Sequence, residues 1–209
     1  QTLPAFEVLF VRFLAGLLVI TPLVWKMGLK IVRTSKLHLH AARGFVGFMG
    51  NLCFFFALIH ITLADTVTIQ FSRPMVMILV AALFLNEAIE LKRGIITILG
   101  FGGILLITKP FGDGFDPWFI VALGGTVFGT GVVLTIKILS RTEETVTIMF
   151  YFALFTTLLA FIPAMIVWET PTWTEVILLV LTGILGIVGQ GLFTHGVGLC
   201  LLYTSPSPR

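Results

Sequence analysis

Charged residues are scarce in this chain of 209 residues. Only 11% of its residues are Asp, Glu, Lys or Arg, whereas 57% are hydrophobic. A soluble domain carries about 25% charged residues and roughly 45–50% apolar ones. Because water could not solvate such a chain folded around an ordinary core, the shortage of charge excludes a soluble enzyme, a disordered protein and a nucleic-acid-binding protein. The composition predicts a polytopic membrane protein without a nucleic-acid partner.

Cysteine and histidine are also rare, with two and four residues. Cys53 and Cys200 both lie in apolar runs, which argues against a disulfide framework and against a metal site. His38 and His40 have no cysteine or acidic residue close by in the sequence, so they do not form a zinc-binding motif. We therefore expect neither a metal nor a cofactor.

Long apolar segments dominate the chain. About 20 apolar residues span a bilayer as a helix. The apolar residues run on without the polar alternation of a membrane barrel, and unpaired strand backbone is costly in lipid. We predict an all-α polytopic membrane protein whose seven spanning helices occupy residues 5–25, 42–61, 66–85, 94–108, 118–136, 145–167 and 176–202.

Basic residues are distributed unevenly between alternate loops. One set of loops holds nine Lys or Arg residues and the other set holds only Lys109. Cytoplasmic loops carry such an excess of positive charge. We therefore predict a multi-pass protein of the cytoplasmic (inner) membrane with its basic loops in the cytoplasm. The nine residues are Lys26, Lys30, Arg33, Lys36, Arg43, Lys92, Arg93, Lys137 and Arg141.

An internal repeat relates the two halves of the chain. Residues 44–54 and 183–193 both read G-x-x-G-x-x-G-[N/Q]-x-x-F, at an offset of 139, and Pro22 and Pro163 match at an offset of 141. This spacing predicts a duplication with five helices in each half. An odd number of helices inverts the second half relative to the first, as in many transporters.

The offset also predicts where each repeat lies. We expect residues 1–112 to form a first repeat that lacks its first helix, and residues 113–202 a second repeat that lacks its last two. Residues 203–209 are expected to be a non-native tail. The natural protein would then have ten helices and about 280–300 residues, which is the scale set by two such repeats.

Several short motifs, taken in order, resemble the EamA type of the drug/metabolite transporter superfamily. They are Phe10-Val-Arg12-Phe13, Phe-Ala-Leu at 56–58, the stretch 64–74 that ends in Ser-Arg-Pro, Phe-Leu-Asn-Glu at 84–87, the glycine-rich residues 100–104 and Lys109-Pro110. The resemblance covers residues 4 to about 200. It implies ten helices in two inverted repeats and the transport of a small metabolite. Asn86 departs from the glycine that the family commonly has there, and the first and last two family helices are absent.

Arg12 and Arg73 are the leading candidates for substrate binding. An arginine in the hydrocarbon core costs about 2.5–3.5 kcal/mol on insertion scales, so each should face protein or a water-filled cavity. Each lies seven residues from the outer end of its expected helix, which is roughly 10 Å in depth. We expect both to contact a carboxylate or phosphate of the substrate. Alternatively they snorkel outward, or pair with Glu7, Asp65 or helix carbonyls.

Three further polar residues are weaker candidates. Asn51 and Gln190 occupy the same repeat position near mid-membrane, where an amide can contact substrate or form a hydrogen bond between helices. Glu87 is the candidate for carrying a coupling proton. It lies beside Lys92 and Arg93 at a helix end, so a solvated or paired carboxylate is the alternative.

The sequence favours a secondary transporter over an enzyme. We expect a small-molecule substrate, anionic or zwitterionic, that crosses the membrane by alternating access. A membrane-embedded lipid-modifying transferase is the first alternative, but it would need a cluster of catalytic His, Asp or Glu at one interface. A structural or assembly subunit is the second, and the intramembrane arginines argue against it. Membrane lipid is an expected partner, and a homodimer is left open.

Overall fold

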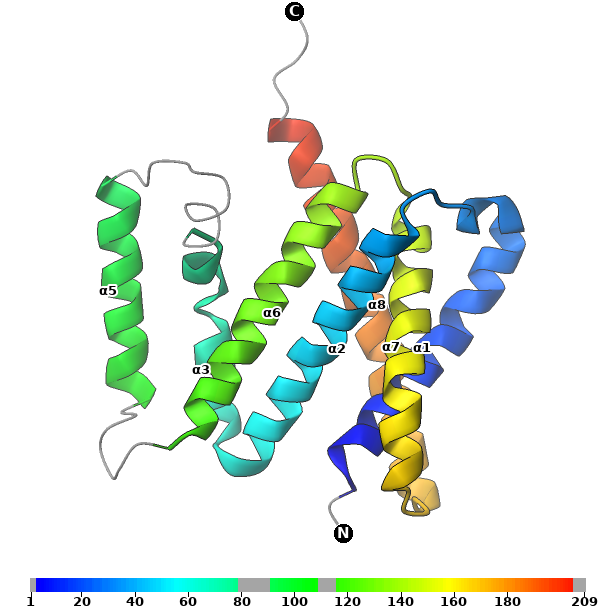
Figure 1. The fold of residues 1–209 in the computed structure, drawn as a ribbon, viewed down its shortest axis with the longest axis horizontal. Helices are drawn as coiled ribbons and strands as arrows, with labels where there is room; N and C mark the ends of the chain where they lie inside the picture. Colours follow the sequence, from blue (N-terminus) through cyan, green and yellow to red (C-terminus); the bar gives the residue numbers. More distant parts are fainter. Residues whose placement is uncertain (1–2, 79–90, 109–115, 205–209) are drawn as a thin grey trace, which may run out of the picture. The chain divides into compact units, whose positions relative to one another are not determined.

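The computed structural model describes residues 3–78, 91–108 and 116–204. Within these ranges the chain is helical throughout and contains no strand (Figure 1), as the sequence predicted. The elements are α1 (Ala5–Met27), the 3-10 turn η1 (Leu29–Val32), α2 (Leu37–His60), α3 (Leu63–Gln70), α5 (Leu91–Thr108), α6 (Trp118–Leu139), α7 (Thr145–Ile166) and α8 (Trp173–Thr204).

Five of the described helices are long and apolar enough to cross a membrane. They are α1, α2, α6 and α7 over their whole lengths, and α8 over Trp173–Leu199. The 23 residues of α1 measure roughly 35 Å at 1.5 Å per residue, which exceeds the hydrocarbon thickness of a bilayer. The prediction of a polytopic membrane protein is confirmed, and the ten-helix architecture stays a prediction.

The prediction of a single helix over residues 66–85 is wrong. In the structure α3 ends at Gln70, a turn follows, and the helix resumes at Arg73. Pro74 explains the break, because proline has no N–H to donate to the Gln70 carbonyl and its ring clashes with that turn. The backbone N–H of Val76 donates to the Ser72 carbonyl over 3.0 Å, so the next helical turn begins afresh. Residues 79–85 lie outside the described ranges.

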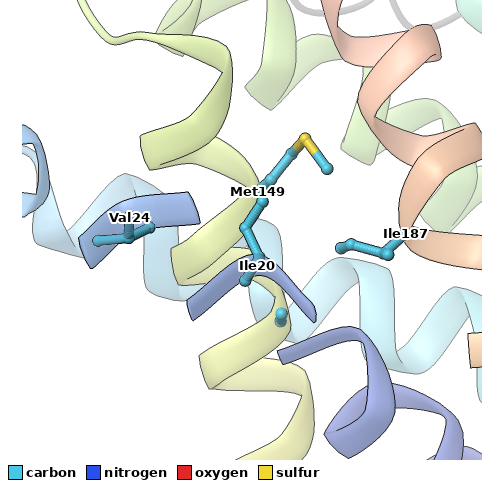
Figure 2. Packing of buried hydrophobic residues seen from close by; sticks show 5 residues of the cluster. Ile20, Val24, Met149 and Ile187 are labelled. Atoms are coloured by element: carbon cyan, nitrogen blue, oxygen red, sulfur yellow. The ribbon is translucent and has the colours of Figure 1, made fainter. Parts of the chain in front are cut away.

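The chain forms two compact units. The first contains the residues up to Phe48 and those from Gly131 onward, and the second is Met49–Thr130. In the first unit α1 packs against α7 and α8. Figure 2 shows residues of its core, which come from α1, α7 and α8. The residues of this core are Ile20, Val24, Met149, Ala153 and Ile187.

The second unit has a core of its own. Ala57 of α2, Ile69 of α3 and Ala122 of α6 are buried together there. The Thr126 hydroxyl of α6 lies beside the same contact and donates to the Ile69 carbonyl over 3.4 Å. The small side chains of Ala57 and Ala122 let the helix backbones approach closely, as is typical of helix packing in membranes.

Side-chain hydrogen bonds fasten the loop between α1 and α2 to the start of α7. The Tyr151 hydroxyl donates to the Val32 carbonyl over 2.6 Å, and the Thr34 hydroxyl donates to the Glu143 carboxylate over 2.7 Å. Two basic loops of the first unit therefore lie together, and the charge count assigns both to the cytoplasmic side.

A buried carboxylate lies near the beginning of α1. The backbone N–H of Glu169, in the loop between α7 and α8, donates to Glu7 Oε2 over 3.2 Å, and Glu7 is fully buried. The first turn of α1 is thus tied to the loop that the charge count places outside the cell.

We expect cysteine labelling to follow this assignment of loops. Ser35→Cys and Thr142→Cys lie in the two basic loops and Thr170→Cys lies in the loop after α7, and all three positions are exposed. In a background with Cys53 and Cys200 replaced by alanine, an impermeant maleimide applied to intact cells should label only position 170. Labelling of positions 35 and 142 before permeabilisation would reverse the topology.

Candidate functional site

Arg12 lies at the interface between α1 and α8. A Cβ built on Gly186 of α8 would lie 3.2 Å from both Nε and Nη2 of Arg12. The side chain is half-buried and has an interaction partner, so it is not an isolated charge. The glycine lets the guanidinium approach the α8 backbone, where a larger residue would displace it.

Arg73 has a similar setting in the second unit. A Cβ on Gly129 of α6 would lie only 2.8 Å from Arg73 Nε, so this guanidinium also lies against a glycine of another helix. Its Nη2 donates to the Gln70 side-chain oxygen over 2.8 Å. Arg73 Nε is buried and has no hydrogen-bond partner among the described residues. One N–H of the group is thus unused by that part of the chain.

The other predicted site residues are distributed over both units. Gln190, like Arg12, belongs to the first unit and is half-buried on α8, whereas Asn51 belongs to the second unit with Arg73 and is half-buried on α2. The single binding site that we predicted for the two arginines therefore stays a prediction. Glu87 lies outside the described residues.

Arg43 is a buried charge that the sequence analysis missed. We counted it among the charges of a cytoplasmic loop, but it lies inside α2 and is fully buried. Its Nη1 donates to the Ile148 carbonyl of α7 over 2.9 Å, and its Nη2 donates to the Thr194 hydroxyl of α8 over 3.4 Å. The guanidinium carbon lies 4.5 Å from the centre of the Phe152 ring, which is a cation–π distance.

His40 lies one helical turn before Arg43 and is also fully buried. Its ring centre lies 4.6 Å from that of Tyr151, and within the described part of the chain neither ring nitrogen has a hydrogen-bond partner. The sequence contains a pattern that indicates this buried helix face, because His40, Arg43, Gly44 and Gly47 recur at intervals of three and four residues. Such positions lie on one face of a helix.

The two glycine motifs make reciprocal contacts within the first unit. Gly44 of α2 lies against Phe155 of α7, where a Cβ on the glycine would be 2.4 Å from the Phe155 Cβ. Its repeat equivalent, Gly183 of α8, lies against Ala15 of α1, at 2.7 Å from the Ala15 Cβ. Phe155 and Ala15 are themselves 140 residues apart, close to the repeat offset of 139.

The same pairing of helices recurs one helical turn further along. A Cβ on Gly47 would lie 2.4 Å from Phe152 Cε2, and its equivalent Gly186 lies against Arg12. Phe152 and Arg12 are again 140 residues apart. Helix α2 thus packs on α7 and helix α8 on α1, and Arg12 takes the position in the α8–α1 contact that Phe152 has in the α2–α7 contact.

A bundle of apolar, membrane-length helices with arginines set into its helix interfaces defines an integral, multi-pass α-helical membrane protein. A model of the EamA-like transporter family matches residues 1–109. The chain belongs to this family, as its short motifs predicted.

Curated relatives of the chain are named as transporters. It is 31% identical over 182 residues to an S-adenosylmethionine uptake transporter of Rickettsia bellii (strain RML369-C), covering 87% of this chain and 62% of that protein. It is 34% identical over 199 residues to the pseudopaline exporter CntI of Pseudomonas aeruginosa (strain UCBPP-PA14), covering 93% and 69%. A riboflavin transporter of Vibrio cholerae is 25% identical over 194 residues, covering 92% and 63%.

A solved structure shares the fold. A crystal structure of a protein with 20% sequence identity superposes with a TM-score of 0.65, over 95% of this chain and 70% of that one. The chain spans less than two thirds of the length of the Rickettsia relative, so the activity of the whole protein is a matter for proposal.

Proposed function

We propose that the protein is a secondary transporter that moves a small anionic or zwitterionic metabolite across the cytoplasmic membrane by alternating access. The observation that carries the proposal is the pair of intramembrane arginines, Arg12 and Arg73, each set against a glycine of a neighbouring helix. Relatives named for S-adenosylmethionine, pseudopaline and riboflavin support transport of metabolites over catalysis.

The roles of the polar residues follow from their chemistry. A guanidinium holds a carboxylate or phosphate by two parallel hydrogen bonds, which suits Arg12 and Arg73 to the acidic group of the substrate. The amides of Asn51 and Gln190 can donate and accept, so we assign them to orientation of the rest of the substrate. Glu87 is our candidate for the coupling proton.

Alternating access is supported by the reciprocal glycine contacts. We propose that residues 1–112 and 113–202 are two inverted repeats, and that α2 and α8 are equivalent helices within them. In such transporters one repeat or bundle rocks against the other around a central site. Glycine interfaces suit this motion because two close backbones can shift without interlocking side chains.

Counterflow in proteoliposomes tests the proposal. We expect liposomes that contain the whole protein and are loaded with unlabelled S-adenosylmethionine to accumulate labelled S-adenosylmethionine faster than protein-free liposomes. Riboflavin, which carries no carboxylate, should compete less well because the arginines select an anionic group. The amount of retained label at early times is the measurement. Equal rates with and without protein for S-adenosylmethionine, pseudopaline and riboflavin would refute transport of these metabolites.

A further inference from the structure

Arg43 is a fully buried cation whose polar contacts, in the part of the chain that the structure describes, are uncharged. They are the Ile148 carbonyl and the Thr194 hydroxyl. Burying a charge is unfavourable unless it is paired and fully hydrogen-bonded. A single backbone carbonyl, one long hydroxyl contact and the Phe152 ring compensate this charge incompletely. The site is therefore electrostatically suited to an anion.

One edge of the Arg43 guanidinium is incompletely hydrogen-bonded. Nη1 is occupied by the Ile148 carbonyl at 2.9 Å, but Nε has no hydrogen-bond partner among the described residues, and the 3.4 Å contact from Nη2 to Thr194 is longer than an ordinary hydrogen bond. The N–H of Nε and one N–H of Nη2 point in the same direction. This fork matches the two oxygens of a carboxylate or phosphate.

His40 adds unused polar atoms on the same helical face. Five buried side-chain polar atoms in the described residues have no partner, and three of them belong to this pair: Arg43 Nε and both ring nitrogens of His40. Buried polar atoms are normally hydrogen-bonded, so a cluster of unpaired ones needs an explanation. A ligand that accepts hydrogen bonds supplies one.

Helix α8 connects this cluster to Arg12. Gly186, against which Arg12 lies, Gln190, and Thr194, which Arg43 contacts, follow one another at intervals of four residues. Residues spaced by four lie on one side of a helix, so the amide of Gln190 lies between the two arginine positions. The eight residues from Gly186 to Thr194 span roughly 12 Å along the helix.

We propose that Arg43, with Thr194 and His40, is a second, inner binding position for the carboxylate or phosphate of the substrate. The acidic group would pass from Arg12 along α8, past Gln190, to the incompletely hydrogen-bonded Nε–Nη2 edge of Arg43. This inference rests on the proposed transport function and extends it by naming where the anion binds toward the basic, cytoplasmic end of the bundle.

Thermal unfolding of the purified protein tests the inner position without any transport step. The probes are acetate and inorganic phosphate, which replace chloride at constant ionic strength in an uncharged detergent. Arg12 and Arg73 are first replaced by glutamine so that they do not contribute. We expect either probe still to raise the unfolding midpoint of this variant by about 2 °C or more. Adding Arg43→Gln should abolish the rise.

Matched variants keep the test decisive. Arg43→Lys keeps the charge but offers no fork, so it should lose most of the rise even if Arg43→Gln fails to fold. Thr194→Val should reduce the rise, and Arg141→Gln, an exposed arginine, should leave it unchanged. The proposal is overturned if the unfolding midpoint still rises in both Arg43 variants. It is also overturned if the variant with only Arg12 and Arg73 replaced shows no rise. Added phosphatidylglycerol that reproduces the rise would assign the position to lipid and overturn it too.

Failure of the inner position and failure of the transport proposal are distinguishable. The unfolding measurement reports anion binding in detergent, where no gradient exists, whereas counterflow reports exchange across a membrane. Counterflow that proceeds while the Arg43-dependent rise is absent would leave the transporter and remove only the inner position.

Discussion

Replacement of Arg73 by leucine should abolish substrate binding while membrane insertion stays intact. The insertion expectation follows because the helix becomes more apolar. Loss of two hydrogen bonds to a charged group, each contributing about 1.5–3 kcal/mol, corresponds to a reduction in affinity of at least about a hundredfold. Arg73→Lys should weaken uptake by about tenfold although the charge survives, since lysine cannot bind a carboxylate with two parallel bonds.

The contact with Gly129 offers a second way to displace Arg73. A Cβ at this position would lie 2.8 Å from Arg73 Nε, so Gly129→Ala should shift the guanidinium without changing its charge. We expect weaker binding than in the wild type and stronger binding than in Arg73→Leu. Gly124→Ala on the same helix is the matched control, because nothing lies within 4 Å of its Cβ.

Counterflow and ligand-dependent thermal stabilisation measure these effects. The outcome that would remove Arg73 from the site is transport by Arg73→Leu at the wild-type rate. If Arg12 contacts the same substrate, Arg12→Leu should behave in the same way. Gly186→Ala should have a milder effect than Gly129→Ala, since its Cβ would lie 3.2 Å from the Arg12 guanidinium instead of 2.8 Å.

Replacement of Gly183 by alanine should destabilise the bundle by about 1–3 kcal/mol, the usual cost of overpacking. The added Cβ would lie 2.6 Å from the Arg12 carbonyl oxygen and 2.7 Å from the Ala15 Cβ. Neither neighbour can move aside by rotation of a side chain, so α1 and α8 must separate. The free energy of unfolding, measured by titration with sodium dodecyl sulfate in mixed micelles, should fall accordingly.

The repeat equivalent and a control sharpen this prediction. Gly44→Ala places its Cβ 2.4 Å from the Phe155 Cβ, and it should destabilise the protein to a similar extent. At Gly189 of α8 nothing lies within 4 Å of an added Cβ. Gly189→Ala should therefore be neutral or stabilising by up to about 1 kcal/mol, because alanine is the better helix former. Equal free energies for Gly183→Ala and Gly189→Ala would show that the α1–α8 contact is looser than the structure has it.

Helix positions were predictable where long apolar runs end in polar or turn-forming residues. The predicted segments 118–136 and 145–167 match α6 (Trp118–Leu139) and α7 (Thr145–Ile166) within a few residues. The start of α2 at Leu37 was missed, since His38, His40 and Arg43 looked like loop residues when hydropathy was the guide. A helix in a bundle can bury such residues if other helices supply their partners.

The break after Gln70 shows a second limit. Pro74 lies within the third predicted segment, and a proline in a membrane helix is compatible with a kink or with a complete interruption. Whether the helix kinks or breaks depends on whether neighbouring groups form hydrogen bonds with the backbone carbonyls that the proline leaves unpaired. In the structure the Ser72 hydroxyl donates to the Ile69 carbonyl over 2.6 Å, and the chain turns there before the helix resumes.

The sequence by itself determined that this protein is a multi-pass helical membrane protein of the EamA-like family. Hydrophobic length, loop charge and short motifs are local properties, and each can be read without knowledge of which helices meet. Tertiary structure alone decided that Gly44 packs against α7 and Gly183 against α1, and that Arg43 is a buried cation whose Nε has no hydrogen-bond partner among the described residues. The physical reason is that burial and hydrogen-bond partnership belong to pairs of helices, and residues such as Arg43 and Thr194 are 151 positions apart in the chain.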